Sequence, residues 1–235
     1  MLTFDVITLF PDYFKTPLDT SLTKRAVDTG RIRVNLHNLR DFAEGPHFQV
    51  DDYPYGGGEG MILKPEPIFA AVEHIKSPQS LFVCFSPRGQ LFNQTLAKEL
   101  YFQYDRFLLL AGRYEGIDER VASGLNPLEL SLGDYILNGG DVATLVFIEV
   151  LSRFVPGVIG KIDALENDSF SMGLLEWPQF TRPPEFRGMK IPEVLLSGNH
   201  QTIERWKREE ALKVTAERRP DLIEKFSILQ ERRKK

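Results

Sequence analysis

Three glycine-containing loops are the part of this sequence best suited to bind a ligand. Each follows a short apolar run: 86–89 after 80–85, 112–116 after 106–111, and 133–140 after 128–132. Glycine allows positive φ angles and lets the backbone approach a ligand closely. Open α/β sheets bind ligands at the carboxyl ends of their parallel strands. Three successive loops of this kind therefore favour a binding site, although each could separately be a turn that needs glycine for steric reasons.

The loop residues indicate what kind of ligand would bind. They match neither the phosphate-binding pattern GxxxxGK[ST] nor the dinucleotide pattern GxGxxG. They are also acidic, with carboxylates at Glu115, Asp118, Glu119, Asp134 and Asp141, whereas phosphate prefers amide donors and lysine. An acidic, aromatic and glycine-rich set suits a nucleoside that carries positive charge. S-adenosylmethionine, with its ammonium and sulfonium groups, fits that description.

A fourth glycine-rich loop covers residues 51–61 and contains two aspartates and two tyrosines. Carboxylates can accept hydrogen bonds from guanine, and tyrosine can stack on a base. We expect RNA contacts here at Asp51, Gly58 and Gly60, the alternative being a flexible surface loop with incidental tyrosines. The histidines at 37, 47, 74 and 200 are scattered in the sequence, and no second carboxylate cluster accompanies the aspartates at 51–52, so we predict no dedicated metal site.

Strands and helices that could position these loops alternate along the chain. The apolar runs predict strands at 3–10, 31–36, 80–85, 106–111 and 128–132. Helices are predicted between them at about 17–28, 66–76, 93–102, 116–123 and 140–153. This order predicts an α/β fold with a mostly parallel sheet, covered by helices on both faces.

The alternation ends near residue 160. Residues 161–171 are polar and without periodicity, and prolines follow at 178, 183, 184 and 192. Asn199 can cap a helix that runs to about Arg219, and a short helix is predicted at about 221–232. We therefore divide the chain into a domain at 1–160, a mobile linker at 161–175 and a small helical domain at 176–235.

Composition and charge narrow the classes of protein further. Residues 201–235 hold 11 Lys/Arg and 7 Asp/Glu, a balance of +4 in a chain whose net charge is −4. A basic C-terminal segment points to an anionic partner such as nucleic acid, the alternative being a solvated helix of mixed charge.

The single cysteine, Cys84, excludes an intrachain disulfide and is expected in a buried strand. No apolar run reaches the roughly 18 residues of a membrane span, and we expect a cytoplasmic protein.

Several longer strings resemble one family over nearly the whole chain. They are VDDYPYGGGEGM at 50–61, SPRG at 86–89, GRYEGIDER at 112–120, LGDYILNGG at 132–140, RFVPGVIGK at 153–161, ENDSF at 166–170 and TRPPEFRG at 181–188. They look like the bacterial tRNA (guanine-37-N1)-methyltransferase family, of the trefoil-knot (SPOUT) class. The chain departs from the usual pattern at Asp141, Glu176 and Phe180, where the family commonly has glutamate, aspartate and tyrosine.

The resemblance implies a fold and an activity. The first domain would end in a trefoil knot made of the three loops, and the second would bind tRNA. The protein would be a homodimer whose active sites are shared between subunits. It would transfer a methyl group from S-adenosylmethionine to N1 of guanosine 37. Carried over by position, the cofactor-binding residues would be Pro87, Gly112, Tyr114, Leu132, Gly133, Asp134, Tyr135, Ile136, Leu137, Gly139 and Gly140.

The resemblance also assigns three catalytic positions. Asp168 would be the general base that removes the proton from guanine N1, a role worth roughly 10²–10⁴-fold in rate. Arg153 would stabilise the negative charge that develops on O6. Glu115 matches a glutamate connected with a dependence on Mg²⁺. Two other classes stay open: a non-catalytic RNA-binding protein with a vestigial pocket, and a nucleotide-hydrolysing α/β enzyme, which the missing phosphate-loop lysine disfavours.

Overall fold

The computed structural model describes residues 1–160, 168–224 and 226 of the 235. The chain forms two compact units, Met1–Lys161 and Ile162–Lys235, which are described separately. Among the described residues, no helix is both long and apolar enough to cross a membrane.

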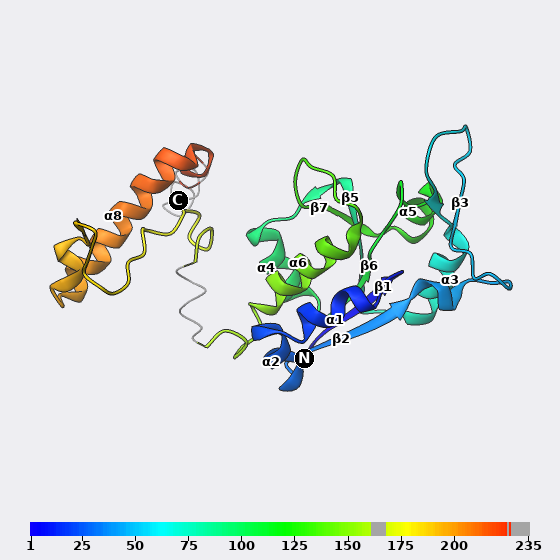
Figure 1. Ribbon diagram of the computed structural model, residues 1–235, viewed down its shortest axis with the longest axis horizontal. Coiled ribbons are helices and arrows are strands. Elements are labelled where there is room, and N and C mark those ends of the chain that lie inside the picture. The colour runs from blue at the N-terminus through cyan, green and yellow to red at the C-terminus, as the bar shows by residue number, and fades with distance from the viewer. Residues whose placement is uncertain (161–167, 225, 227–235) are drawn as a thin grey trace. The chain divides into compact units, whose positions relative to one another are not determined.

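A parallel sheet forms the centre of the first unit (Figure 1). Its five described strands lie in the order β2-β1-β6-β5-β7, and every neighbouring pair is parallel. Their bounds are β1 Leu2–Thr8, β2 Ile32–Asn38, β5 Leu81–Leu91, β6 Arg106–Leu110 and β7 Leu128–Ser131. The predicted fold class, α/β with a mostly parallel sheet, is confirmed.

Helices cover both faces of this sheet, which makes the unit three layers thick. On β6, Phe107 and Leu109 pack into one apolar cluster and Leu108 and Leu110 into another, because successive side chains of a strand point to opposite faces. The first face carries α1 Asp12–Leu18, α2 Ser21–Asp28, α4 Gln94–Gln103 and α6 Gly140–Ser152. The second carries α3 Pro65–Ile75 and α5 Glu119–Leu125, with the 3₁₀ turn η1 Leu39–Phe42.

The structure differs from the sequence-based predictions in local detail. The single helix predicted at 17–28 is wrong, because the chain forms α1 and α2 with a break where Thr20 is extended and Ser21 has a φ of +57°. Strand β5 continues past residue 85 through the first glycine loop to Leu91, with a register shift against β7. A small antiparallel pair, β3 Asp51–Asp52 and β4 Ile62–Leu63, holds the ends of the fourth loop.

The second unit is built around helix α8, His200–Arg218. The Asn199 side chain accepts a hydrogen bond from the backbone N–H of Thr202, so the predicted cap is confirmed. Thr215, buried on α8, accepts a hydrogen bond from the Leu175 N–H and so fixes the preceding chain to the helix. The rest comprises the hairpin β8 Glu185–Phe186 and β9 Met189–Lys190, the turn η2 Glu193–Leu196, and helical residues at 220–224. The remainder of the helix predicted at 221–232 lies outside the described residues, apart from residue 226.

A buried carboxylate joins three strands of the first unit. Asp5 on β1 is 2% exposed and accepts hydrogen bonds from Asn35 (2.8 Å) and Arg106 (2.8 Å), with His37 at 3.2 Å. Burial by itself raises the pKa of Asp5, but the hydrogen bonds with His37, Arg106 and Asn35 outweigh it and lower the pKa to about 2. The ionised carboxylate therefore stabilises the folded state.

This cluster predicts acid sensitivity. Because the folded pKa lies below the unfolded value, the stabilisation is present above about pH 4 and is lost as the pH falls towards 2. We expect Asp5→Asn to lower the free energy of unfolding at pH 7 by about 2 kcal/mol, with the difference from the parent vanishing near pH 2. Urea unfolding across this pH range measures it. Asp12→Asn, which removes an exposed pair with Lys15, is the control and should change stability little. A constant difference from pH 7 to pH 2 would contradict the assignment.

Candidate cofactor-binding site

The three predicted glycine segments meet around one cavity of about 620 Å³. Residues 86–89 lie within the last part of β5, and the other two segments are the loops after β6 and β7. The volume of the cavity lies in the range of small-molecule sites. Its lining includes ten of the predicted cofactor-binding residues: Pro87, Gly112, Tyr114, Leu132, Gly133, Tyr135, Ile136, Leu137, Gly139 and Gly140. The eleventh, Asp134, is exposed on the same loop and does not line the cavity.

Close backbone contacts between the loops depend on two glycines. A β-carbon at Gly89 would lie 2.5 Å from the nitrogen of Leu130, on the neighbouring strand. A β-carbon at Gly140, the first residue of α6, would lie 2.8 Å from the Gly112 nitrogen and 3.0 Å from Ala111 Cα. Gly140 also donates its backbone N–H to the Gly112 carbonyl at 2.7 Å. The loops thus touch through main chain, and the start of α6 is fixed against the loop after β6.

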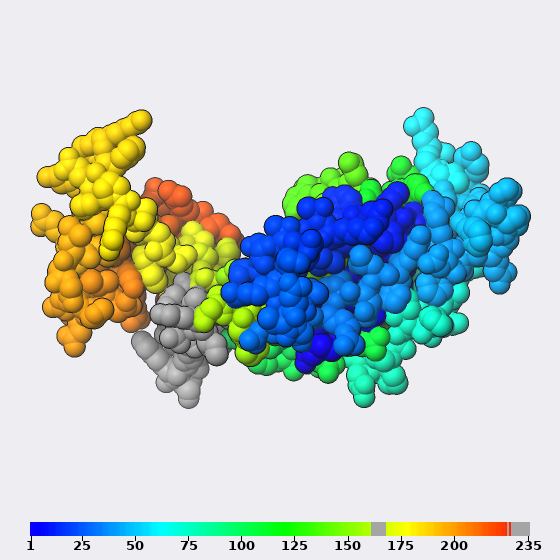
Figure 2. Space-filling view, turned by 60° about the horizontal axis from the view of Figure 1, so that its bottom comes forward, coloured from blue at the N-terminus to red at the C-terminus, as the bar shows by residue number. Residues whose placement is uncertain are grey.

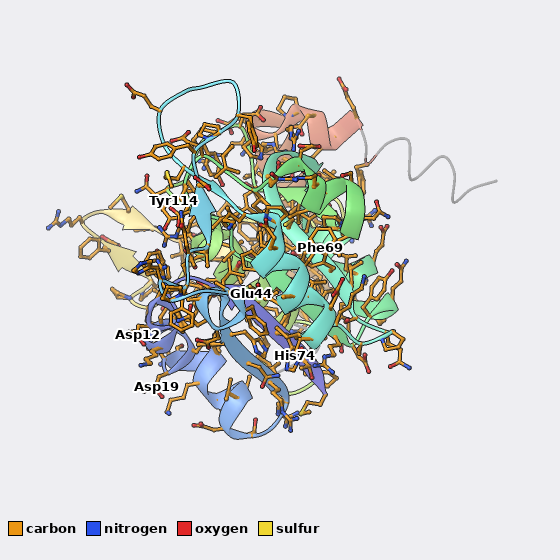
Figure 3. The ribbon with its side chains drawn as sticks, turned by 90° about the vertical axis from the view of Figure 1, so that its right-hand side faces the viewer. Asp12, Asp19, Glu44, Phe69, His74 and Tyr114 are labelled. Atoms are coloured by element: carbon orange, nitrogen blue, oxygen red, sulfur yellow. The ribbon has the colours of Figure 1, made fainter. Side chains whose placement is uncertain are left out.

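Tyr114 adopts a conformation that is uncommon for a residue with a side chain. Its φ is +61°, in the left-handed region, and it lies 44% exposed at the cavity (Figure 3). Such conformations cost free energy and concentrate at binding and catalytic sites. The next residue, Glu115, donates its backbone N–H to Met61, and a β-carbon at Gly60 would lie 2.4 Å from the Glu115 side chain. The end of the fourth loop therefore borders the cavity.

Arg113 ties one cavity loop to the helices around it. Its guanidinium forms an ion pair with Asp141 on α6 (2.5 Å) and lies 4.7 Å from the ring centroid of Phe10. Asp141 is 1% exposed and also accepts a hydrogen bond from Thr8 at 2.7 Å. A β-carbon at Gly139 would lie 2.5 Å from Arg113 Cδ. Arg113 thus holds the last residues of the loop between β7 and α6.

The cavity has a surplus of negative charge. Arg88 pairs with Glu119 (2.8 Å) and Arg120 with Asp118 (2.8 Å). Within the described part of the chain, Glu115 and Glu129 line the cavity without an ion pair. Carboxylates outnumber guanidinium groups in the lining, and this excess of negative charge favours a ligand with positive charge.

Cys84 lies at the edge of this cavity, on β5. Burial, and to a smaller extent the charge of Glu129, raise the pKa of its thiol to about 12. It therefore stays protonated at neutral pH and is a structural residue rather than a nucleophile.

The other predicted residues lie elsewhere. Asp51 pairs with Leu63 in the small β3–β4 sheet, and Gly58 is exposed in the loop that this sheet closes, with a φ of +131°. Arg153 directly follows α6, and its N–H donates to the Glu149 carbonyl. Asp168 belongs to the second unit, where its backbone carbonyl accepts from the Ser171 N–H.

Comparison with known proteins identifies the family. Residues 2–225 match the family model described as tRNA (Guanine-1)-methyltransferase TrmD. The chain belongs to this family. It is 52% identical over 231 residues to a tRNA (guanine-N(1)-)-methyltransferase of Dictyoglomus turgidum, with 98% of this chain and 94% of that one covered. Enzymes of the same name from Dehalococcoides mccartyi and Geotalea uraniireducens are each 51% identical, with 98% and 94% of this chain and 94% and 90% of theirs covered.

Membership confirms the family predicted from the motifs, and with it the trefoil-knot class of the fold. Three charged residues of the cavity, Arg88, Arg113 and Glu129, were not predicted from the sequence as site residues. Glu129 could have been noticed because it interrupts the apolar strand 128–132. Arg113 could not, because its partners Phe10 and Asp141 are distant in sequence.

Proposed function

We propose that this protein transfers the methyl group of S-adenosylmethionine to N1 of guanosine 37 in tRNA. Membership of the tRNA (guanine-1)-methyltransferase family supports the reaction. The single structural observation that carries the proposal is the glycine-walled cavity at the ends of β5, β6 and β7. Because the reaction acts on tRNA, we place the protein in the cytoplasm.

The residues of the cavity fit S-adenosylmethionine. Backbone groups of the loops at 112–116 and 132–140 offer donors and acceptors for an adenine edge, and apolar side chains such as Leu137 can cover its ring. Glu115 and Glu129 supply negative charge for the ammonium and sulfonium groups. When bound, the cofactor supplies an electrophilic methyl carbon, whose bond to sulfur breaks as guanine N1 attacks it.

The chain's own residues prepare the guanine in this proposal. Asp168 accepts the N1 proton, which frees the lone pair that attacks the methyl carbon. Arg153 donates hydrogen bonds to O6, where negative charge grows as the proton leaves. The loop with Asp51, Gly58 and Gly60 contacts the RNA next to the reacting base, and the border between Gly60 and Glu115 supports this placement.

The proposal also includes Mg²⁺ and a second copy of the chain. Magnesium often takes one or two carboxylates together with water and substrate oxygens, which is compatible with Glu115. No group of three or more potential ligands gathers within the described ranges. A homodimer with shared active sites is supported by the exposed apolar side chains Tyr13, Val142 and Val146 on the neighbouring helices α1 and α6.

Methyl transfer to a defined RNA tests the proposed function. The full chain would be incubated with methyl-labelled S-adenosylmethionine and an unmodified tRNA transcript with guanosine at position 37, and the product nucleosides identified by mass spectrometry. We expect 1-methylguanosine, and none from a transcript with adenosine at that position. Tight tRNA binding without methyl transfer would favour a non-catalytic RNA-binding protein. Tight binding of ATP, with no binding of S-adenosylmethionine, would favour a nucleotide-hydrolysing enzyme.

A further inference from the structure

A second cavity, of about 560 Å³, lies within the second unit. It is formed where the chain at 177–184 and the turn η2 come together with α8, and Figure 2 shows these segments on the molecular surface in yellow and orange. It is lined by Trp177, Pro178, Gln179, Phe180, Thr181, Arg182, Pro184, Ile191, Leu195, Leu196 and Lys207. None of the proposed catalytic or cofactor-binding residues is among them.

The walls of this cavity are aromatic and apolar but open to solvent. Phe180 is 47% exposed and Leu196 is 62% exposed. The Phe180 ring contacts the ring of Trp206 on α8 at a tilt of 47°, with ring centroids 6.5 Å apart. Exposed apolar side chains that gather around a hollow usually mark a site where a ligand or partner binds. The ring of Phe180 is thus held in place as a platform.

The charged side chains of the cavity, Arg182 and Lys207, are cationic. The Lys207 ammonium lies 4.7 Å from the ring centroid of Trp177 and 2.7 Å from Glu204 Oε1, and Arg182 is exposed at the edge. None of the lining residues that the structure describes is acidic. This arrangement is the opposite of the first cavity, where carboxylates are in surplus, and it suits a ligand that combines a flat ring with negative charge.

We propose that this cavity binds an unstacked nucleotide of the RNA substrate, apart from the guanosine that is methylated. The base stacks on Phe180, and its phosphate lies near Arg182 and Lys207. Proteins bind single-stranded RNA by this combination, in which aromatic side chains stack on bases and cations attract the backbone. The inference rests on the proposed function, since it takes tRNA as the substrate, and it specifies where a second base is held.

Variants at the platform test this inference in the full-length protein. We expect Phe180→Ala to weaken the affinity for unmodified tRNA by about 5- to 100-fold, the range for loss of one base-stacking contact. Phe180→Tyr keeps a ring and should retain the parent affinity. Fluorescence anisotropy at fixed ionic strength measures the tRNA affinity of the parent and of both variants. Calorimetric affinity for S-adenosylmethionine should be the same in each, because the proposed cofactor cavity lies in the first unit. Phe180→Tyr, which should bind tRNA like the parent, is the control for the folding of the second unit.

A matched pair of lysines on α8 tests the charge. Lys207 and Lys213 each pair with a glutamate three residues before them, Glu204 and Glu210. Lys207→Gln should weaken tRNA binding and reduce its dependence on salt by about one counterion, whereas Lys213→Gln should do neither.

Equal tRNA affinities for the parent, Phe180→Ala and Lys207→Gln would overturn the proposal and leave the cavity to another partner, such as an acidic peptide. The parent's methyl transfer to tRNA is measured in the same preparations. A parent that methylates tRNA while both variants bind it normally refutes the second cavity alone, whereas a parent that neither binds nor methylates tRNA refutes the proposed function as well.

Discussion

Replacing Asp168 by asparagine is expected to slow methyl transfer to tRNA by about 10²- to 10⁴-fold, the contribution typical of a general base. Asparagine keeps the shape of the side chain but cannot take up the N1 proton of guanine. Since Asp168 lies in the second unit and the glycine-walled cavity lies in the first, affinity for S-adenosylmethionine should stay the same. Single-turnover kinetics with saturating tRNA measure the rate of the chemical step.

The control is Glu185→Gln, which removes another carboxylate from the second unit. Glu185 is exposed and pairs only loosely with Lys190, at 3.9 Å, so its loss should leave the rate unchanged. The proposed role of Asp168 is wrong if Asp168→Asn turns over within a few-fold of the parent. It is also wrong if the loss of rate is matched by an equal loss of cofactor affinity, because the residue would then act on binding.

The second large effect is expected at Gly140, where alanine should weaken the affinity for S-adenosylmethionine by about 10- to 100-fold. Its β-carbon would meet the backbone of Ala111 and Gly112 at 2.8–3.2 Å. Backbone cannot rotate away as a side chain can, so the start of α6 must separate from the loop after β6. Overpacking of this kind costs about 1–3 kcal/mol, and here it would distort the wall of the cavity. Isothermal titration calorimetry measures the affinity.

Gly160→Ala is the matched control in the same unit. No atom lies within 4 Å of the position that its β-carbon would take, so cofactor affinity should be that of the parent. If Gly140→Ala binds S-adenosylmethionine as tightly as Gly160→Ala does, the contact between the loops is not needed for the cofactor.

The sheet could be predicted from the sequence because its strands coincide with short apolar runs, three of which are followed by glycine-containing segments. Strands at 106–111 and 128–132 were found almost to the residue, since burial on both faces leaves few polar positions. The break between α1 and α2 was missed because residues 17–28 carry the periodicity of one helix, and the positive φ of Ser21 has no sequence signal. The pair of β3 and β4 was missed because two residues are too few to show alternation.

For the candidate site, the position of the loops could be predicted from the sequence, but the side-chain contacts between them could not. Glycine spacing identified the three loops, and the structure brings them together around one cavity. The contact of Arg113 with Asp141 and Phe10 could not be predicted, because it depends on how α1, α6 and the loop after β6 pack. The roles of Arg153 and Asp168 come from the resemblance to the family alone, since neither position has a pattern that distinguishes it from an ordinary surface residue.

The central claim is that residues 86–89 of β5 and the loops after β6 and β7 enclose the methyl donor. A crystal structure of the full chain with S-adenosylhomocysteine tests it most directly. The account predicts electron density for the ligand within the cavity between residues 86–89, 112–116 and 132–140, with its adenine against the backbone of the last loop. Density at another place in the molecule, with this cavity empty, would contradict it.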